Sequence, residues 1–405
     1  DKQYLKAIKH LMEKHGCDVP MFTSDGGWRE VLDAGTLLNE GVLPTANFGS
    51  RTDEQIGALR QFMSDNDIHG PLMCMEFWIG WFNNWGSPLK TRDAKDAADE
   101  LDAMLRQGSV NIYMFHGGTN PEFYNGCSYH NGMDPQITSY DYAAPLTEWG
   151  TEGEKYAAFR EVIAKYNPIT PVPLSTPITF KSYGELRCEN QVSLFNTLSS
   201  LAKPIETDIP QPMEKLGQGY GYILYRAHVG KARELAKAKL ADCDDRAQVF
   251  VNQKLIATQY KETMGSNIPL TLDHPSDNVI DILVENLGRI NYGASLVSPH
   301  QRKGIKGGFM LDLHFHTGWQ QYCLELNNVE QVDFTQDYQS GVPAFYEFVV
   351  EIDEPADMFL NLCGWGKGCA FINGENLGRF WDIGPTHYLY IPAPLFNKGK
   401  NTVIL

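Results

Sequence analysis

The residue best placed to do chemistry is a carboxylate at the end of a short apolar run. Residues 72–75 have the length and composition of a buried parallel strand, and Glu76 follows them directly. Aromatic residues come next, separated by small or amide residues: Phe77, Trp78, Trp81, Phe82 and Trp85. A charge beside buried rings is unfavourable unless it functions, so the pattern favours a catalytic carboxylate facing rings that stack on a sugar. The structural alternative is a strand whose last Glu caps a helix or pairs with an Arg.

Hydrolysis of a glycosidic bond requires two carboxyl groups, one as acid and one as nucleophile or base. Glu76 is the best single candidate for one of them. The candidates for the second are Asp25, Glu122, Asp134 and Asp141. Asp25 stands in a Ser-Asp-Gly turn signature, which favours a structural role. Glu122 follows Pro121 in a loop, where contact with a ligand is the minority interpretation.

Tyrosines gather near the same predicted strand ends. Tyr113 lies in a strand pattern with His116 just beyond it, while Tyr140 and Tyr142 lie in a loop near the same rim. A tyrosine can stack on a sugar and form hydrogen bonds with its hydroxyl groups. By spacing alone, packing with a satisfied hydroxyl explains each tyrosine equally well. For His116, a hydrogen-bonded structural histidine is the favoured interpretation.

Predicted strands and helices alternate in the first part of the chain. Strands are expected at 19–23, 43–48, 72–76 and 109–115, and helices at 1–15, 52–63, 93–107 and 151–166. Thr52 and Thr151 each begin a capping-box pattern. The alternation predicts βα units and a parallel sheet, with polar and aromatic residues at the strand ends where a (β/α)8 barrel holds its chemistry. Four units supply only half of such a barrel.

The chain changes character after Asn167. Prolines predict an extended linker, at Pro168, Pro171, Pro173 and Pro177. Short alternating strands follow at 222–225, 248–251, 279–284, 345–350 and 370–372, and a weak repeat relates 284–289 to 374–379. We therefore expect four regions: the second half of a catalytic barrel at 1–168, a linker with a first β segment at 169–190, and β-sandwich domains at 191–300 and 301–405.

Composition excludes several classes of partner. A net charge of −16 argues against nucleic acid, and the 405 residues contain no apolar run long enough to span a membrane. The eight cysteines show no zinc spacing, so neither a metal nor a cofactor is predicted. Cys74 is expected to be a buried thiol, and a Cys363–Cys369 bridge stays open. The sequence also leaves open whether the chain forms a homo-oligomer and in which compartment it lies, with a periplasmic or secreted location slightly favoured.

Four separated motifs resemble those of glycoside hydrolase family 35, the β-galactosidases, and bacterial members above all. They are the segments 73–86, 111–120, 138–142 and 366–381. The resemblance implies a (β/α)8 barrel followed by two galactose-binding-type jelly rolls, and a retaining mechanism with Glu76 as nucleophile. It also implies four residues around the galactose: Tyr142, Tyr113, Tyr140 and Trp78. Trp78 falls where some members of the family carry Tyr, so its contact differs from theirs.

The resemblance further implies a missing half. The family's acid/base Glu belongs to an Asn-Glu-Tyr-Gly type of motif that should precede the first helix, and the sequence lacks it together with four βα units. We therefore expect a portion of a larger retaining exo-β-galactosidase, inactive alone, that acts on a β-galactoside oligosaccharide or glycoconjugate. Two alternatives stay open. One is a non-catalytic galactose- or glycan-binding protein, and the other is the same mechanism acting on a β-glucosaminide.

Overall fold

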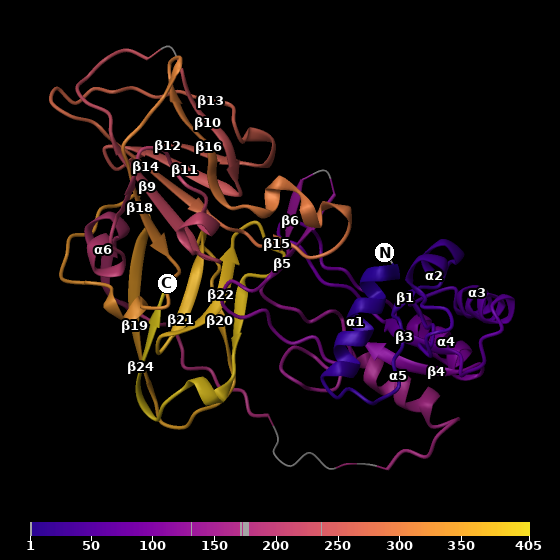
Figure 1. Ribbon diagram of the computed structural model, residues 1–405. Coiled ribbons are helices and arrows are strands. Elements are labelled where there is room, and N and C mark those ends of the chain that lie inside the picture. Colours follow the sequence, from indigo (N-terminus) through magenta and orange to yellow (C-terminus); the bar gives the residue numbers. More distant parts are fainter. Residues whose placement is uncertain (1, 131, 171, 173–177, 236) are drawn as a thin grey trace. The chain divides into compact units, whose positions relative to one another are not determined.

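The chain forms two compact units. The computed structural model describes residues 2–130, 132–170, 172, 178–235 and 237–405 (Figure 1). Unit 1 consists of Asp1–Asn83, Leu89–Thr119 and Ser139–Pro177, and unit 2 of Asn84–Pro88, Asn120–Thr138 and Ile178–Leu405. Unit 1 combines helices with a parallel sheet and unit 2 is almost entirely β, so the fold is a multidomain α/β plus all-β fold. Of the predicted linker prolines, Pro171, Pro173 and Pro177 lie outside the described residues.

Unit 1 is built on a four-stranded sheet in the order β1-β2-β3-β4, with every neighbouring pair parallel. Its strands are β1 (Asp25–Gly26), β2 (Ala46–Phe48), β3 (Met73–Trp78) and β4 (Ser109–Tyr113). Its helices are α1 (Lys2–Lys14), α2 (Arg29–Gly35), α3 (Thr52–Asp65), α4 (Ala94–Leu105) and α5 (Glu154–Ile163). The predicted alternation and the parallel sheet are therefore confirmed.

An apolar core joins the sheet to its helices. The buried side chains are Leu32 of α2, Ile56, Leu59 and Phe62 of α3, Leu101 of α4 and Phe159 of α5, with Ala46, Cys74 and Phe77 of the strands. Cys74 and Phe77 are three positions apart, and the ladder between β3 and β4 shifts its register between them. The shift lets both residues face the core, whereas Glu76 between them is only half-buried.

Several element ends differ from the sequence prediction. Within 19–23 only Phe22 pairs, in an isolated bridge with Leu43, and the strand forms at Asp25–Gly26 instead. Neither predicted capping box forms. At α3 the carboxylate of Glu100, on α4, accepts the backbone N–H of Thr52 at 2.9 Å, and α5 begins after Gly153 without a side-chain cap. A distant side chain supplies the cap, which no local pattern could reveal.

Helix α1 forms as predicted, but its apolar face is not buried. Tyr4, Ile8, Leu11 and Met12 are all exposed. On β4, Ser109 and Asn111 are exposed as well. Contiguous exposed apolar side chains are typical of surfaces that pack against something else.

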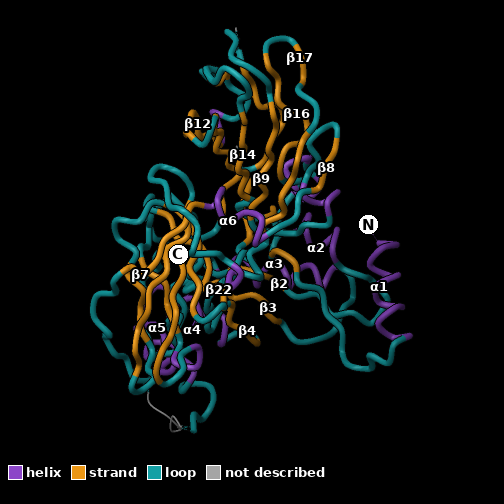
Figure 2. The backbone as a smooth tube through the Cα atoms, turned by 90° about the vertical axis from the view of Figure 1, so that its left-hand side faces the viewer, coloured by secondary structure: helices purple, strands orange, loops and turns teal. Residues whose placement is uncertain are grey.

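Unit 2 consists mainly of antiparallel sheets, and its described residues include one α-helix, α6 (Leu194–Leu201) (Figures 1 and 2). One six-stranded sheet has the order β12-β11-β14-β9-β18-β8 and one four-stranded sheet β13-β10-β16-β17. Their strands are β8 (Ile205–Thr207), β9 (Tyr222–His228), β10 (Ala238–Asp244), β11 (Arg246–Val251), β12 (Lys254–Tyr260), β13 (Asn267–Ile268), β14 (Val279–Glu285), β16 (Gly304–Leu311), β17 (His314–Phe315) and β18 (Trp319–Leu324).

A five-stranded sheet, β22-β21-β24-β19-β7, and the pair β20-β23 complete the main sheets of unit 2. Their strands are β7 (Cys188–Ser193), β19 (Ala344–Ile352), β20 (Met358–Asn361), β21 (Lys367–Ile372), β22 (Glu375–Trp381), β23 (Tyr388–Ile391) and β24 (Gly399–Ile404). All five segments that the sequence predicted as strands here are found, as β9, β11, β14, β19 and β21.

The sheets divide at a different place from the predicted boundary near residue 300. Strands β16 and β18 follow residue 300, yet they pair with β10 and β9. Strand β7 spans the start of the first predicted sandwich, at residue 191, and pairs with β19 of the second. The predicted limits 191–300 and 301–405 therefore differ from those of the sheets, because alternation reveals a strand but not its partner.

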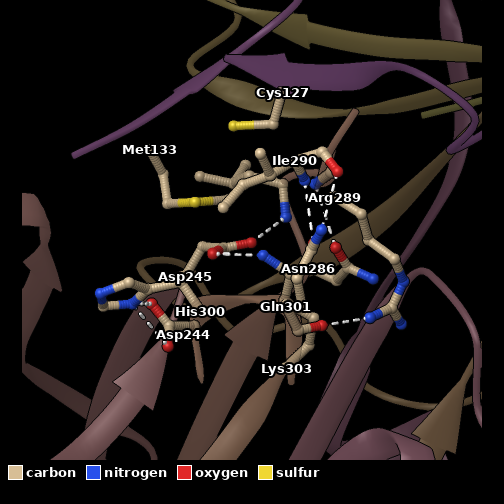
Figure 3. Close-up of polar contacts among 12 residues, drawn as sticks. Cys127, Met133, Asp244, Asp245, Asn286, Arg289, Ile290, His300, Gln301 and Lys303 are labelled. Atoms are coloured by element: carbon tan, nitrogen blue, oxygen red, sulfur yellow. Dashed lines mark hydrogen bonds and ion pairs between the residues drawn. The ribbon is translucent and has the colours of Figure 1, made fainter. Parts of the chain in front are cut away.

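Residues 120–138 belong to unit 2 although unit 1 precedes and follows them. The strands involved are β5 (Gly126–Tyr129), β6 (Met133–Pro135) and β15 (Arg289–Ile290), which form one three-stranded sheet. Figure 3 shows the polar contacts beside it. The Gln301 amide binds both backbone groups of Ile290, at 3.0 and 2.7 Å, and buried Lys303 pairs with Asp245 at 2.8 Å. The Gln301 bonds hold β15, the strand with which β5 pairs.

A buried charge cluster ties three parts of unit 2 together. Arg379 on β22 and Glu285 on β14 are each 2% exposed, and Arg379 Nε lies 3.2 Å from Glu285 Oε1. Lys367 Nζ reaches the same oxygen at 2.5 Å. The Arg379 guanidinium also donates to the Asn125 side chain and to the Asn286 carbonyl. One arginine thus links β14, β22 and the segment before β5.

Replacing this arginine should loosen unit 2. Arg379→Met leaves Glu285 with Lys367 as its one ion-pair partner among the described residues and removes the guanidinium donors of the Asn125 side chain and the Asn286 carbonyl, which should destabilise unit 2 by about 3 kcal/mol, the low end for a broken buried pair. Hydrogen exchange should quicken in β14 and β22 and stay unchanged in β3. Lys181→Met is the control, because Lys181 forms an exposed pair with Asp353 and should alter little. Unchanged protection of β14 in Arg379→Met would contradict the assignment.

Candidate active site

The four parallel strands place their carboxyl ends at one edge of the sheet of unit 1. In the ladder between β2 and β3, Asn47 stands opposite Glu76. In the ladder between β3 and β4, Trp78 stands opposite Tyr113. An amide, a carboxylate, an indole and a phenol from three neighbouring strands therefore meet at one edge.

Glu76 is half-buried and held from two sides. The indole Nε1 of Trp78 donates a hydrogen bond to Glu76 Oε2 at 3.0 Å. The backbone N–H of Glu76 donates to Asn47 Oδ1 at 3.1 Å, and Asn47 is bonded in turn to the Ser24 hydroxyl. Among the described residues no Lys or Arg forms an ion pair with Glu76. The salt bridge of the structural alternative is thus not what holds this carboxylate.

Three tyrosines form a cluster near the carboxylate. The rings of Tyr140 and Tyr142 stack with centroids 5.6 Å apart, and Tyr113 meets Tyr142 edge-on at 5.8 Å. Burial is the main cause that raises the pKa of the Tyr142 and Tyr140 phenols, and the neighbouring tyrosines and the charge of Glu76 add to the rise. Both phenols therefore stay protonated and keep a hydrogen to donate beside Glu76.

An aromatic wall continues from Trp78. Its ring pairs are Trp78–Trp81 at 5.9 Å, Trp81–Tyr142 at 6.3 Å and Phe82–Tyr140 at 6.3 Å. The other two rings of the run lie elsewhere. Phe77 is in the core of unit 1, and Trp85 packs with Trp381 inside unit 2.

Two glycines let the loop that carries the tyrosines approach this edge. A Cβ on Gly80 would lie 1.7 Å from the carbonyl oxygen of Tyr142, and a Cβ on Gly117 would lie 1.7 Å from that of Tyr140. Both contacts are with backbone, which cannot swing aside as a flexible side chain can. Only glycine leaves room for the loop at these positions.

Within unit 1, the candidate second carboxyls serve other groups. Asp25 packs against the backbone of Gly35 at the end of α2, and burial raises the pKa of the Asp25 carboxyl. Asp141 accepts the backbone N–H groups of Ala143 and Glu148, each at 3.1 Å. Both arrangements are those of structural residues.

The other two candidates belong to unit 2. Asp134 pairs with Lys261 at 2.9 Å, and Glu122 lies in the segment before β5. His116 Nε2 lies 3.0 Å from the carbonyl oxygen of Glu148, in agreement with the structural interpretation of this histidine. Asp134 and Glu122 thus belong to the other unit, and among the described residues of unit 1 His116 makes no hydrogen bond to Glu76.

Cys74 is buried, as predicted, and desolvation raises the pKa of its thiol to about 12. Cys363 and Cys369 are both free thiols. Within the described ranges, no group of three or more His, Cys, Asp or Glu side chains has the geometry to hold a metal ion. In the same part of the chain, no helix is both long and apolar enough to cross a membrane.

Comparison with known proteins gives the family. The model described as glycosyl hydrolases family 35 matches residues 1–166. Models of the β-galactosidase first all-beta domain and galactose-binding domain match 210–325 and 343–401. Beta-galactosidase 8 of Oryza sativa subsp. japonica is 32% identical over 459 residues, which cover 100% of this chain and 68% of that protein. The chain belongs to glycosyl hydrolase family 35.

Two further relatives of this family 35 chain extend across nearly all of it. A beta-galactosidase of Xanthomonas manihotis is 36% identical over 96% of this chain and 64% of its own length. Human beta-galactosidase-1-like protein 2 is 35% identical over 100% of this chain and 64% of its own. The chain thus spans about 64% of the first relatives it matches. A solved GH2 beta-galacturonidase from Eisenbergiella tayi, 12% identical over 56% of this chain and 37% of that one, has a TM-score of 0.20, which supports no argument.

Sequence reasoning missed one buried carboxylate that binds the segment carrying the tyrosines. Glu148 is 6% exposed, and its carboxylate accepts hydrogen bonds from the hydroxyl groups of Thr119 and Ser139. Burial raises the pKa of this carboxyl, while the hydroxyl groups oppose the rise. Glu148 lies in a loop without helical or strand periodicity, so only its distant partners mark it.

The two glycines can be tested against a matched control. Gly80→Ala should destabilise unit 1 and displace Tyr142, because a Cβ only 1.7 Å from the Tyr142 carbonyl oxygen forces the backbone to move. Gly57→Ala, inside α3 with open space at its Cβ, should instead stabilise the unit by about 0.5–1 kcal/mol. Thermal unfolding of the two variants checks both signs. A Gly80→Ala protein as stable as wild type would show that the loop does not rest on this residue.

Proposed function

We propose that this chain carries the nucleophile of a retaining exo-β-galactosidase that removes terminal, non-reducing β-D-galactosyl residues. The observation that carries the proposal is Glu76, a half-buried carboxylate held by Trp78 and Asn47. It has no cationic partner among the described residues, and the protonated phenols of Tyr140 and Tyr142 stand beside it. Curated relatives named beta-galactosidase support the choice of sugar.

The reaction takes two displacements at the anomeric carbon. Trp78 engages Oε2 of Glu76, so Oε1 is the oxygen that attacks. The bond from Oε1 to the anomeric carbon forms as the bond to the leaving oxygen breaks, and an acid protonates that oxygen. Water, deprotonated by the same group, then attacks the anomeric carbon and releases galactose with Glu76 restored. The Trp78 N–H stabilises the departing carboxylate in this second step.

The tyrosines and tryptophan hold the sugar. Tyr142 donates its phenolic hydrogen to a galactose hydroxyl, and Tyr113 and Tyr140 line the same pocket. Trp78 forms part of its wall. Because these rings also shield Glu76 from bulk water, the carboxylate stays a stronger nucleophile than an exposed one would be.

The acid/base group comes, in this proposal, from sequence outside the 405 residues. Retaining enzymes hold their two carboxyls about 5–5.5 Å apart, and the candidates within unit 1 serve other groups. Unit 1 would then be the second half of a (β/α)8 barrel, with the remaining strands and helices supplied by the same missing part. The exposed apolar residues of α1 and the exposed side chains of β4 support this completion. The two β parts of unit 2 would be jelly rolls.

Two other functions remain in competition. The chain's match to a galactose-binding domain model favours a glycan-binding protein without hydrolysis as the second candidate. Calorimetry with galactose distinguishes it, since binding without any turnover in the completed protein would support that candidate. The same mechanism on a β-glucosaminide is distinguished by comparing rates on the aryl galactoside and the aryl glucosaminide.

Substitution of the nucleophile tests the proposal. In the protein that includes its acid/base segment, Glu76→Gln should lower turnover of an aryl β-galactoside by at least about 1,000-fold, or roughly 4 kcal/mol in activation free energy. Glu161→Gln, an exposed position on α5, is the matched control and should stay within about twofold. Turnover by Glu76→Gln within about tenfold of wild type would exclude the nucleophile role.

A further inference from the structure

Glu148 is a buried carboxylate behind the tyrosine loop, the segment Ser139–Ala143. Its Oε1 accepts the hydroxyl hydrogen of Thr119 at 2.5 Å, and its Oε2 accepts that of Ser139 at 2.6 Å. Thr119 belongs to the segment that follows β4, and Ser139 begins the tyrosine loop. One carboxylate therefore binds both segments through short hydrogen bonds to a charged acceptor.

The backbone of Glu148 makes the same two connections again. Its N–H donates to Asp141 Oδ2 at 3.1 Å, inside the tyrosine loop. Its carbonyl oxygen lies 3.0 Å from Nε2 of His116, in the segment that follows β4. The two segments also bond directly, since the Tyr140 N–H donates to the Gly118 carbonyl at 2.8 Å. The N–H and the carbonyl of Glu148 thus bind the same two segments that its side chain binds.

The tyrosine loop needs such support because its backbone is strained. Tyr142 and Ala143 have φ values of 64° and 50°, in the left-handed region that residues with a Cβ seldom adopt. Asp141 Oδ1 accepts the Ala143 N–H at 3.1 Å, and buried Lys155 donates to the Ala143 carbonyl at 2.7 Å. The backbone N–H of Glu148 binds the other carboxylate oxygen of Asp141. Glu148 therefore helps to fix the side chain that supports this conformation.

We propose that Glu148 is a positioning residue, which acts on the sugar through Tyr142 and Tyr140 and touches no substrate itself. It fixes the tyrosine loop against the segment after β4, so that both phenols face Glu76. This inference rests on the proposed function and adds to it a determinant of galactose binding. Loss of Glu148 should therefore weaken the hold on galactose without removing any group that reacts.

Kinetics of Glu148→Ala test the inference in the protein that includes its acid/base segment. The substitution removes both acceptors, and the hydroxyl groups of Thr119 and Ser139 lose their buried partner. We expect kcat/KM on an aryl β-galactoside to fall about 10- to 100-fold, with KM rising more than kcat falls, because the tyrosine contacts are made before and during reaction. Glu148→Gln should recover activity to within about threefold, since an amide of the same shape can accept one hydroxyl hydrogen and donate to the other oxygen.

A neighbouring glutamate supplies the control. Glu152 is exposed in the same loop and makes none of these contacts, so Glu152→Ala should leave both constants unchanged. If Glu148→Ala does not fold, two variants of nearly unchanged volume replace it. Thr119→Val removes the hydrogen bond to Glu148, and Ser139→Ala removes its bond to Glu148 together with the longer one from the Asp141 N–H at 3.3 Å. Each should raise KM several-fold.

Two results would overturn the inference. One is a lower melting temperature with KM and kcat unchanged in the folded fraction, which would make Glu148 structural only. The other is a Glu148→Gln variant as impaired as Glu148→Ala. Neither result touches the proposed function, which fails separately if Glu76→Gln remains active.

Discussion

The structure depends on the register of three neighbouring parallel strands. Strand β3 buries Cys74 and Phe77 against the helices, and the shift in its pairing between them leaves Glu76 outside that core. Because the strands are parallel, the residues at their carboxyl ends come to one edge whatever the loops do. Asn47 and Tyr113 are therefore beside Glu76 and Trp78 by the geometry of the sheet. The carboxylate is held without a counter-charge among the described residues, by an indole and through the backbone by an amide.

The tyrosine loop contributes the rings of Tyr140 and Tyr142, and three features of the structure hold the loop in place. Gly80 and Gly117 let its backbone lie directly on the strand ends, where any side chain would collide with it. The Ala143 N–H donates to Asp141 and the Ala143 carbonyl accepts from Lys155, and these two hydrogen bonds keep the left-handed turn of the loop. Glu148 ties it to the neighbouring segment. A rigid edge and a loop fastened at several points together fix the orientation of rings that a flexible loop could not fix.

The sequence predicted those features that depend on local pattern. The strand ending near Glu76, the alternating helices and the five β segments of the later part all followed from periodicity, and four motifs identified the family. Distant contacts were not predictable in the same way. Glu100 caps α3 from another helix, β16 and β18 pair with earlier strands across the expected boundary, and Glu148 acts through residues 9 and 29 positions away. In each case the partner is set by tertiary packing, which a single stretch of sequence does not encode.

The central claim is that Glu76 becomes covalently linked to galactose. In an activated 2-deoxy-2-fluoro-β-galactoside the fluorine slows both displacements and the good leaving group keeps the first one fast, so the compound should inactivate the completed protein with one sugar bound per chain. Digestion and mass spectrometry should then find the added sugar on the peptide that contains Glu76, and on Glu76 itself. A label on any other carboxylate, or an active enzyme that turns over galactosides with inversion at the anomeric carbon and takes up no label, would contradict the account.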